Sequence, residues 1–507
     1  MIQHIDHVAL LPLYAAAGTA VLVLVMDLAV ARRTPVLLAG LFGALATAVA
    51  AVAVAATAAH RATFCNGLPP GPDDVPPDCS WVADPIAALT AVVFAALTAG
   101  VLALSAPMLR AGIVPAGEYC FLLACSMTGG VVVGYADDLI TLIVGLETLT
   151  LPLYVLVGLR RFAPGEPVRT AGASAAVTFF IVSVVSTTVA LLGAALVYAT
   201  TGALHLRLLV FGEPLTPLAS VGSTLIIVGL AFKVAAVPMH AWAPVTYDGA
   251  PLPVAAYLST ASKLGGVIAL VAVMDRALPF DATAPVLAVL AVLTMTVGNL
   301  VALRQVRTVR LLAWSSVAQA GYILAPLAAA GSTVGHGERA WAAAVTATVA
   351  YAVFFVALEL TAFAAVVALR PAGADGGDLA DLRGAGRRSP WVGAVLVLAL
   401  AGLAGLPPGL AGLFAKAAVV SSLIGGGAGW LAGFVALNTV IALAYYVRVA
   451  AALYASPADG PITPDFPVPP PAPRRVPWPV AAALAAAAAV VVALGLAPQL
   501  VFSAITL

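Results

Sequence analysis

Fourteen apolar runs occupy almost the whole chain, and each is long enough to cross a bilayer, which takes about 20 mostly apolar residues in a helix. The longest polar stretches, 60–83 and 455–476, are rich in Pro, Gly and Asp and are predicted to be loops. Almost no sequence remains for a soluble domain. The pattern therefore predicts an all-α, multi-pass membrane protein with spans near 8–30, 35–59, 84–107, 114–134, 138–159, 174–200, 219–246, 251–274, 283–303, 310–330, 341–369, 391–424, 430–454 and 477–499.

The scarcity of charge excludes several classes of protein. Charged residues make up 9% of the chain and hydrophobic residues 63%, whereas a soluble globular protein carries about 25% charged residues. The formal net charge is +1, so there is no electrostatic signature of polyanion binding. A soluble enzyme, a disordered regulator and a nucleic-acid binder are excluded.

The arginines predict the orientation of the chain in the membrane. Arginine is retained on the cytoplasmic side, and one set of alternate loops holds 16 arginines against 4 in the other set. The richer set is predicted to be cytoplasmic, which places both termini on the extracytoplasmic side. The high Ala, Gly and Arg content is typical of a GC-rich bacterial genome, so the membrane is predicted to be a bacterial inner or plasma membrane. The poorer set consists of Arg61, Arg207, Arg276 and Arg339.

The three lysines behave differently from the 20 arginines. Every arginine falls in a loop or near a helix end, whereas Lys233, Lys263 and Lys416 all lie inside apolar segments. Arginine keeps its proton at any accessible pH, while a desolvated lysine can exchange one near neutrality. An ionisable group within a span points to an ion or proton path. Lysines that extend to the membrane surface from helix ends are disfavoured, because each has apolar residues on both sides.

Two acids and a histidine join the lysines as candidates. Glu147 lies about nine residues into the span near 138–159, where pairing with a lysine would let both groups stay charged. Glu359 is a second acid within a span, and structural pairing and proton handling both remain open for it. His240 follows Lys233 by seven residues, about two helical turns, and could relay protons or serve as a hydrogen-bonded structural residue.

Prolines predict that two of the spans are broken helices. Pro238 follows Lys233 by five residues, and the pair Pro407 and Pro408 precedes Lys416 by eight residues, counted from the second proline. Lysine-then-proline in one half and proline-then-lysine in the other is the arrangement that an inverted repeat would give. Interrupted helices at matching places in two halves point to a site near the middle of the membrane.

The four cysteines give no sign of a metal or redox site. Cys65 and Cys79 share the loop 60–83, where a disulfide can form if that side is oxidising, and the sequence leaves this open. Cys120 and Cys125 lie within a span and are predicted to be inert packing thiols. No spacing suggests a zinc, haem or iron–sulfur site.

Several motifs, in order, resemble the antiporter-like membrane subunits of respiratory complex I, and especially the subunit N family of NADH-quinone oxidoreductase. The resemblance runs from about 115 to 450 and is carried by GLETLTLPLYVLVGLRR at 145–161, FKVAAVPMHAWAPVTYDGAPLPVAAYLSTASKLGG at 232–266, GNLVALRQVRTVRLLAWSSVAQAGYIL at 298–324, DLRGAGRRSP at 381–390 and LAGLPPGLAGLFAK at 403–416. Mrp-type cation/proton antiporters share this family and most of the motifs.

The resemblance implies a proton-translocating subunit of about fourteen helices. In this interpretation Glu147 pairs with Lys233, Lys263 bridges at the centre and Lys416 ends the path. The implied organisation is N-terminal helices over 1–113, two inverted five-helix repeats over 114–275 and 276–454, and a cytoplasmic loop with the last helix over 455–507. It implies no cofactor in this chain. NADH, FMN, iron–sulfur clusters and quinone are expected in partner subunits, which would be the other membrane and peripheral subunits of the complex.

The sequence departs from the family pattern at two places. The stretch GASAAVTFF at 172–180 lacks the glutamate and lysine that relatives usually carry there, and Glu359 stands where a neutral polar residue is expected. Three alternatives stay open: a subunit of a stand-alone multi-subunit Na⁺/H⁺ antiporter, a structural subunit whose lysines are buried ion pairs, and an unrelated secondary transporter. The sequence does not distinguish H⁺ from Na⁺.

Overall fold

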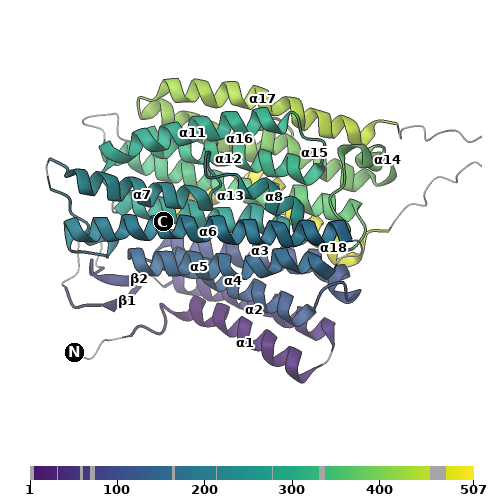
Figure 1. The fold of residues 1–507 in the computed structure, drawn as a ribbon, viewed down its shortest axis with the longest axis horizontal. Helices are drawn as coiled ribbons and strands as arrows, with labels where there is room; N and C mark the ends of the chain where they lie inside the picture. The colour runs from purple at the N-terminus through teal and green to yellow at the C-terminus, as the bar shows by residue number, and fades with distance from the viewer. Residues whose placement is uncertain are drawn as a thin grey trace, which may run out of the picture.

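A computed structural model describes residues 5–30, 32–57, 61–68, 75–162, 166–212, 214–276, 278–329, 337–456 and 475–506. Its helices lie side by side and run roughly along one direction, as a membrane bundle requires (Figure 1). The first group consists of α1 (Leu11–Ala29), α2 (Arg33–Ala55), α3 (Pro85–Arg110), α4 (Ala116–Tyr135), α5 (Leu139–Gly158) and α6 (Glu166–Thr201).

The middle of the chain forms α7 (Pro217–Lys233), α8 (Trp242–Gly249), α9 (Leu252–Tyr257), the π-helical turn η3 (Leu258–Ser262), α10 (Lys263–Arg276), α11 (Phe280–Ala302), α12 (Thr308–Ala329) and α13 (Gly337–Leu369). The last part forms α14 (Ala385–Arg388), α15 (Pro390–Ala404), α16 (Leu410–Gly425), α17 (Gly429–Tyr454), α18 (Trp478–Leu496) and α19 (Gln499–Thr506). Short 3₁₀ turns are η1 (Leu159–Phe162), η2 (Leu206–Leu208) and η4 (Leu379–Leu382).

The prediction of a multi-pass helical membrane protein is confirmed. Among the described residues, 12 helices, with α9, η3 and α10 taken as one, are long and apolar enough to cross a membrane. The other two predicted spans, near 219–246 and 391–424, are each interrupted. The first splits into α7 and α8, and the second into α15 and α16. The exact count of fourteen crossings and the two inverted repeats stay predictions.

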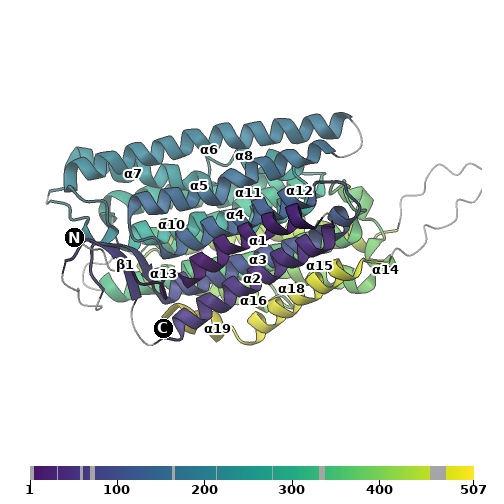
Figure 2. The ribbon, with the colours of Figure 1, turned by 90° about the horizontal axis from the view of Figure 1, so that it is seen from below.

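One element departs from an all-α fold. Residues of the predicted loop 60–83 form an antiparallel hairpin of β1 (Arg61–Cys65) and β2 (Cys79–Ala83), and a disulfide joins Cys65 to Cys79. The hairpin packs onto the helix ends through Trp81, whose indole donates to the Ala9 carbonyl and stacks on Tyr135. Figure 2 places β1 and the last helix, α19, toward the same end of the bundle, which we call the hairpin end.

Helix starts follow the local sequence. Asp84 caps α3 by accepting from the backbone N–H of Ala87 at 2.7 Å, and Asp138 caps α5 by accepting from two N–H groups. Side-chain oxygens at this position satisfy backbone donors that a helix start leaves free. Proline stands in the first turn of α1, α3, α7, α9, α15 and α18, where its missing N–H costs no hydrogen bond.

The core is built from three spans in the middle of the chain. We compare the share of buried residues in an apolar stretch of 18 residues from each span. This share is 94% in the α9–η3–α10 span, 89% in α12 and 78% in α13, whereas it is 28% in α1. The C-terminal α18 returns to pack against α3 and α13, far from it in sequence. The three central spans are therefore screened from lipid by their neighbours, and two of them carry candidate residues, Lys263 on α10 and Glu359 on α13.

The end opposite the hairpin is fastened by charged residues, which we call the ion cluster. Arg307, before α12, binds Asp248 of α8 at 2.8 Å and Asp375, after α13, at 2.9 Å. Arg160 of η1 donates to the Asp248 backbone carbonyl and lies 3.8 Å from the Asp375 carboxylate, and Arg370 binds Asp375 at 3.3 Å. The cluster thus joins the ends of α5, α8, α12 and α13.

Candidate proton path

The first charged pair lies where α5 meets α7. The Lys233 ammonium donates to Oε1 of Glu147 at 2.8 Å, so the structure brings together the two residues that the sequence analysis paired. The Lys233 side chain is 4% exposed and that of Glu147 is 29% exposed. Lys233 is the last residue of α7, where the free carbonyls of a helix C-terminus favour a cation.

Hydroxyl groups complete the surroundings of the Lys233 ammonium. It also donates to Thr150 Oγ1 and Ser183 Oγ, each at 3.1 Å, so all three ammonium hydrogens have an acceptor. Thr187 donates to Glu147 Oε1 at 2.5 Å. The sequence motifs did not point to these hydroxyls. Their signal was present, because Ser183 and Thr187 lie four residues apart on α6 and therefore on one face.

The first break, between α7 and α8, has its backbone groups satisfied by side chains. The Trp242 indole donates to the Phe232 carbonyl at 3.1 Å, and the Val237 N–H donates to Thr294 of α11 at 2.9 Å. Pro238 lies within the break, as predicted. Buried polar groups of a broken helix are tolerated where protein rather than lipid surrounds them. Lys233 can thus end its helix at this depth.

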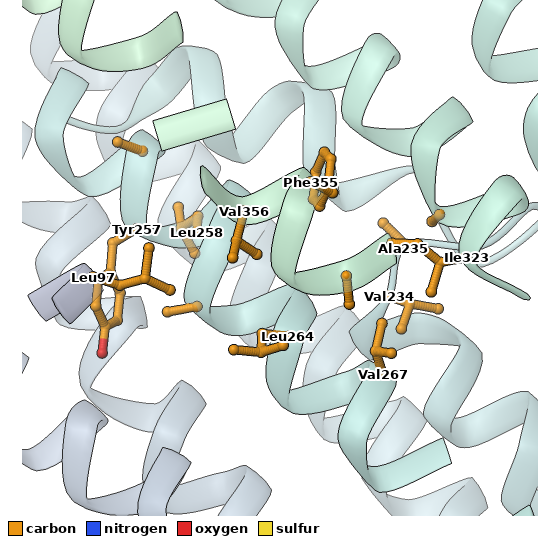
Figure 3. Close-up of a cluster of buried hydrophobic side chains, with 14 of the residues drawn as sticks. Leu97, Val234, Ala235, Tyr257, Leu258, Leu264, Val267, Ile323, Phe355 and Val356 are labelled. Carbon is orange, nitrogen blue, oxygen red and sulfur yellow. The ribbon is translucent and has the colours of Figure 1, made fainter. Parts of the chain in front are cut away.

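Lys263 occupies the apolar centre of the bundle. Its side chain is 1% exposed, and its ammonium donates to the backbone carbonyl of Ser316 in α12. Figure 3 shows buried hydrophobic side chains of this region, with Leu264 and Val267 near the start of α10 and Phe355 and Val356 on α13. The π-helical turn η3 ends immediately before Lys263. Such turns often occur at functional sites, and nothing in the sequence analysis predicted it.

Glu359 of α13 is fully buried, at 0% exposure, and neither of its carboxylate oxygens has a hydrogen-bond partner among the described residues. It lies close enough to interact electrostatically with Lys263, Tyr247 and Tyr446. A buried carboxylate without hydrogen bonds is costly. Glu359 therefore lies on α13, which packs against the helix of the central lysine.

Lys416 lies against the second break. Its ammonium donates to the Ala404 carbonyl at 2.9 Å and lies 4.7 Å from the centre of the Tyr322 ring. Ala404 is the last residue of α15, and Gly405 follows in the left-handed conformation, with φ of 78°. Pro407 and Pro408 lie between α15 and α16, as predicted. Both outer lysines therefore lie next to a break, but in different ways: Lys233 is the last residue of α7, whereas Lys416 lies within α16 and binds the C-terminal carbonyl of α15.

His240 is placed in the first break but away from the lysines. Its ring is half-buried, packs 5.0 Å from the ring centre of Trp314 and contacts the Pro238 carbonyl at 3.2 Å. Among the described contacts, none joins His240 to a lysine or to Glu359. The structure brings Glu147 and Lys233 into contact, places Lys263 and Glu359 on adjoining helices, and leaves His240 at the side.

The helices that carry these residues form a continuous series. α10 contacts α7, α12 and α13, and α16 contacts α12 and α13. The order across the bundle is thus Glu147 and Lys233, then Lys263 and Glu359, then Lys416. Alternating buried bases and acids can pass a proton when a neighbour changes its charge. Among the described residues, no group of three or more His, Cys, Asp or Glu side chains could hold a metal ion.

Comparison with known proteins shows the family of the chain. Residues 136–442 match the family model described as NADH:quinone oxidoreductase/Mrp antiporter, TM. NADH-quinone oxidoreductase subunit N of Salinispora tropica is 65% identical over 462 residues, which cover 90% of this chain and 86% of that protein. The chain belongs to the subunit N family of NADH-quinone oxidoreductases.

Subunit N relatives are also found outside that genus. NADH-quinone oxidoreductase subunit N 2 of Streptomyces griseus is 43% identical over 91% of this chain and 85% of the relative. The resemblance drawn from the motifs is thereby confirmed, as is the prediction of an antiporter-like subunit of the proton-translocating type.

Solved structures share the fold. A chain of respiratory complex I from Thermus thermophilus is 28% identical with a TM-score of 0.76, over 97% of this chain and 99% of that chain. A chain of the Mrp complex from Dietzia aligns with a TM-score of 0.82 at 23% identity, over 99% of this chain and 96% of that chain. The latter likeness shows the fold alone.

Proposed function

We propose that this chain translocates protons as a membrane subunit of an NADH-quinone oxidoreductase, with energy supplied by electron transfer from NADH to quinone elsewhere in the complex. The observation that carries the proposal is the buried ion pair of Glu147 and Lys233, followed by Lys263 and Lys416 on adjoining helices. NADH, FMN, iron–sulfur clusters and quinone are assigned to partner subunits, and none of them is assigned to this chain.

The working cycle begins at the ion pair. While Glu147 contacts Lys233, the carboxylate holds the lysine protonated. When the pair separates, the buried ammonium loses its counter-charge, and its proton passes to Lys263 and then towards Lys416. Moving one charge against 100 mV requires about 2.3 kcal/mol, and one pKa unit corresponds to about 1.4 kcal/mol. A shift of about two units at one site is thus sufficient.

Glu359 and His240 have secondary roles in this proposal. Glu359 lies on α13, which packs against α10, so its charge can influence whether Lys263 holds a proton. Its burial without hydrogen bonds favours proton handling over static pairing. His240 lies in the break after Lys233 and can exchange protons with the surroundings of that break.

The exposed side of Glu147 indicates a partner subunit. Glu147 lines a hollow of about 320 Å³ on the outer face of α5 and α6, between Val144 and Leu151, which are 56% and 58% exposed. A carboxylate within a span is expensive against lipid. We assign this flank to contact with a neighbouring membrane subunit of the complex.

The orientation of the chain follows from charge and redox chemistry. The ion cluster contains Arg160, Arg307 and Arg370, all from the arginine-rich loop set, and the disulfide lies at the opposite end. Disulfides form on the oxidising side of a membrane. The proposal therefore puts the hairpin end and both termini on the extracytoplasmic side, with inverted repeats over 114–275 and 276–454.

The test uses the complete complex in inverted membrane vesicles. E147Q and K233A are expected to reduce NADH-driven acidification more than tenfold while the chain still inserts and co-purifies with its peripheral subunits. E118Q is the matched control, because Glu118 lies exposed in the first turn of α4. Full pumping in both E147Q and K233A would overturn the proposal, as would co-purification with small membrane subunits alone.

A further inference from the structure

A network of neutral side chains lies between the second and third lysines, and no part of the proposed path uses it. Its centre is Gln319 of α12, which is 1% exposed. The Gln319 amide donates to the Leu403 carbonyl at 3.0 Å and to the Tyr446 hydroxyl at 3.1 Å, and its oxygen accepts from the Tyr351 hydroxyl at 2.6 Å. One amide thereby joins α12, α13, α15 and α17.

The two carbonyls at the end of α15 connect this network to Lys416. Leu403 and Ala404 are consecutive, and the break after them removes the helical N–H groups that would bind their oxygens. Gln319 binds the Leu403 oxygen and Lys416 binds the Ala404 oxygen. The position of the α15 end relative to Gln319 therefore sets where the Lys416 ammonium is held.

The same turn of α12 holds the other lysine. Lys263 donates to the carbonyl of Ser316, three residues before Gln319, which is about 4.5 Å along the helix axis. Ser315, in the preceding position, shares a hydrogen bond of 2.5 Å with the Tyr446 hydroxyl. One turn of α12 is therefore linked to both lysines. Its Ser316 carbonyl accepts a hydrogen bond from Lys263, and its Gln319 side chain binds the end of α15 that holds Lys416.

We infer that Gln319 is the positioning residue that couples the sites of Lys263 and Lys416. The inference rests on the proposed function and extends it to the step between these lysines. An amide does not keep an excess proton near neutral pH, so Gln319 does not carry the proton itself. It fixes the broken end of α15, the phenols of Tyr351 and Tyr446, and hence the geometry across which the proton passes.

Two substitutions separate this role from general packing. Q319L keeps approximate size but can neither donate nor accept, so the ratio of protons pumped to NADH oxidised is expected to fall about fivefold or more. Q319E keeps shape and acquires a titratable group. A neutral carboxyl group can donate one hydrogen bond and accept others, as the amide does, whereas a carboxylate can only accept.

The pH profile is the decisive measurement. Q319E is expected to approach the pumping ratio of the wild type as pH falls from 8 to 6 and to lose it as pH rises, while Q319L stays low throughout. The titratable groups in contact with Gln319 are Tyr351 of α13 and Tyr446 of α17. Around these two lie Tyr322 of α12, which lies near both Tyr351 and Lys416, Tyr445 of α17, which packs on Tyr446, and Glu359, which acts on Tyr446. These neighbouring groups titrate in the wild type as well. The pumping ratio of each variant is therefore divided by the wild-type ratio measured at the same pH.

The controls make failure of the inference distinguishable from failure of the proposed function. T348V is matched to Gln319, because Thr348 is fully buried on α13, one turn from Tyr351, and its hydroxyl has no hydrogen bond among the described residues. Y351F removes one bond of the network and is expected to lower the ratio by about twofold to fivefold. Assembly is checked by co-purification of the complex.

Each outcome decides the matter. A low ratio in Q319L with recovery of Q319E at low pH supports the inference. Wild-type ratios in Q319L and Y351F, or an equal fall in T348V, overturn it. K416A reports separately on the proposed function, because full pumping in K416A contradicts the path itself, whereas loss in K416A with full pumping in Q319L contradicts only the role of Gln319.

Discussion

Gly266 lies directly against Lys233. A Cβ atom added at Gly266 would come 2.8 Å from the Cβ of Lys233 and 2.9 Å from its carbonyl carbon. Gly266 follows Lys263 by three residues on α10, so both are on nearly the same face of that helix. The lack of a side chain at Gly266 therefore sets how closely the helices of the first two lysines approach.

G266A is expected to push α10 away from α7, because the atoms it would meet belong to the backbone and Cβ of Lys233 and cannot rotate away. A misplacement of about 1 Å can lower a rate about a hundredfold, so we expect pumping to fall at least tenfold. The measurement is vesicle acidification per NADH oxidised. G433A is the control, since Gly433 of α17 has open space around its Cβ position, and unimpaired pumping in G266A would contradict the spacing role.

S183A should weaken pumping without preventing insertion. The Ser183 hydroxyl accepts from both Lys233 and Tyr154, at 3.1 and 2.6 Å, so its removal leaves two buried donors without this acceptor. Each such donor costs about 1–3 kcal/mol. We expect initial pumping rates at least fivefold lower. T188V on the same helix is the comparison, because the Thr188 hydroxyl bonds only the Val184 carbonyl in the described contacts and is exposed; equal effects of the two changes would refute the prediction.

The hairpin should be reached by reagents from outside the cell. In intact cells, a membrane-impermeant maleimide is expected to label Cys65 and Cys79 only after reduction, because the two thiols are joined in a disulfide. Cys120 and Cys125, within α4, should stay unlabelled. A loop closure of about 15 residues is worth about 3 kcal/mol, so the double serine variant should also unfold at lower temperature. Labelling that needs permeabilised cells would reverse the proposed orientation.

The ion cluster should lose stability in acid. Burial raises the pKa of Asp375, but the hydrogen bond from Arg307 and the charges of Arg307, Arg160 and Arg370 outweigh it and hold that pKa below the usual 3.8. A carboxyl whose pKa is lowered by folding stabilises the fold above its unfolded pKa, and this stabilisation disappears as pH falls through the folded pKa. The contribution of Asp375 is thus complete at pH 7 and is lost below about pH 4.

Thermal unfolding of the solubilised complex at pH 7, 5 and 3.5 measures this contribution. D375N is expected to unfold at lower temperature than the wild type at pH 7 and to lose less on acidification. The D381N variant is a milder comparison, because Asp381 is 48% exposed and binds Arg370 alone among the described arginines. Identical acid sensitivity in D375N and the wild type would show that Asp375 does not titrate as described.

The charged residues of the proposed path stand out in the sequence because charge in an apolar span is rare and costly. The family resemblance implied the pair of Glu147 and Lys233, which the structure places in contact, and the prolines located both breaks. The hydroxyl and amide partners were not predicted. Ser183, Thr187 and Gln319 are residue types that membrane helices tolerate, and their role depends on which helix faces them. The β-hairpin was predicted as a loop for another reason. Its strands are only five residues each and lie in a stretch rich in turn-forming residues.

The ion cluster has a mechanical consequence for the ion pair of Glu147 and Lys233. Arg160 ties the end of α5 to the cluster, and Glu147 lies thirteen residues earlier, about 20 Å away along the helix axis. With that end held by the cluster, any tilt of α5 would be centred there. A tilt of about 3° at the cluster moves the Glu147 carboxylate by about 1 Å, which is enough to lengthen a hydrogen bond beyond its working range. A neighbouring subunit that displaces the exposed side of α5 would therefore change the distance between Glu147 and Lys233 while the ion cluster stays nearly in place.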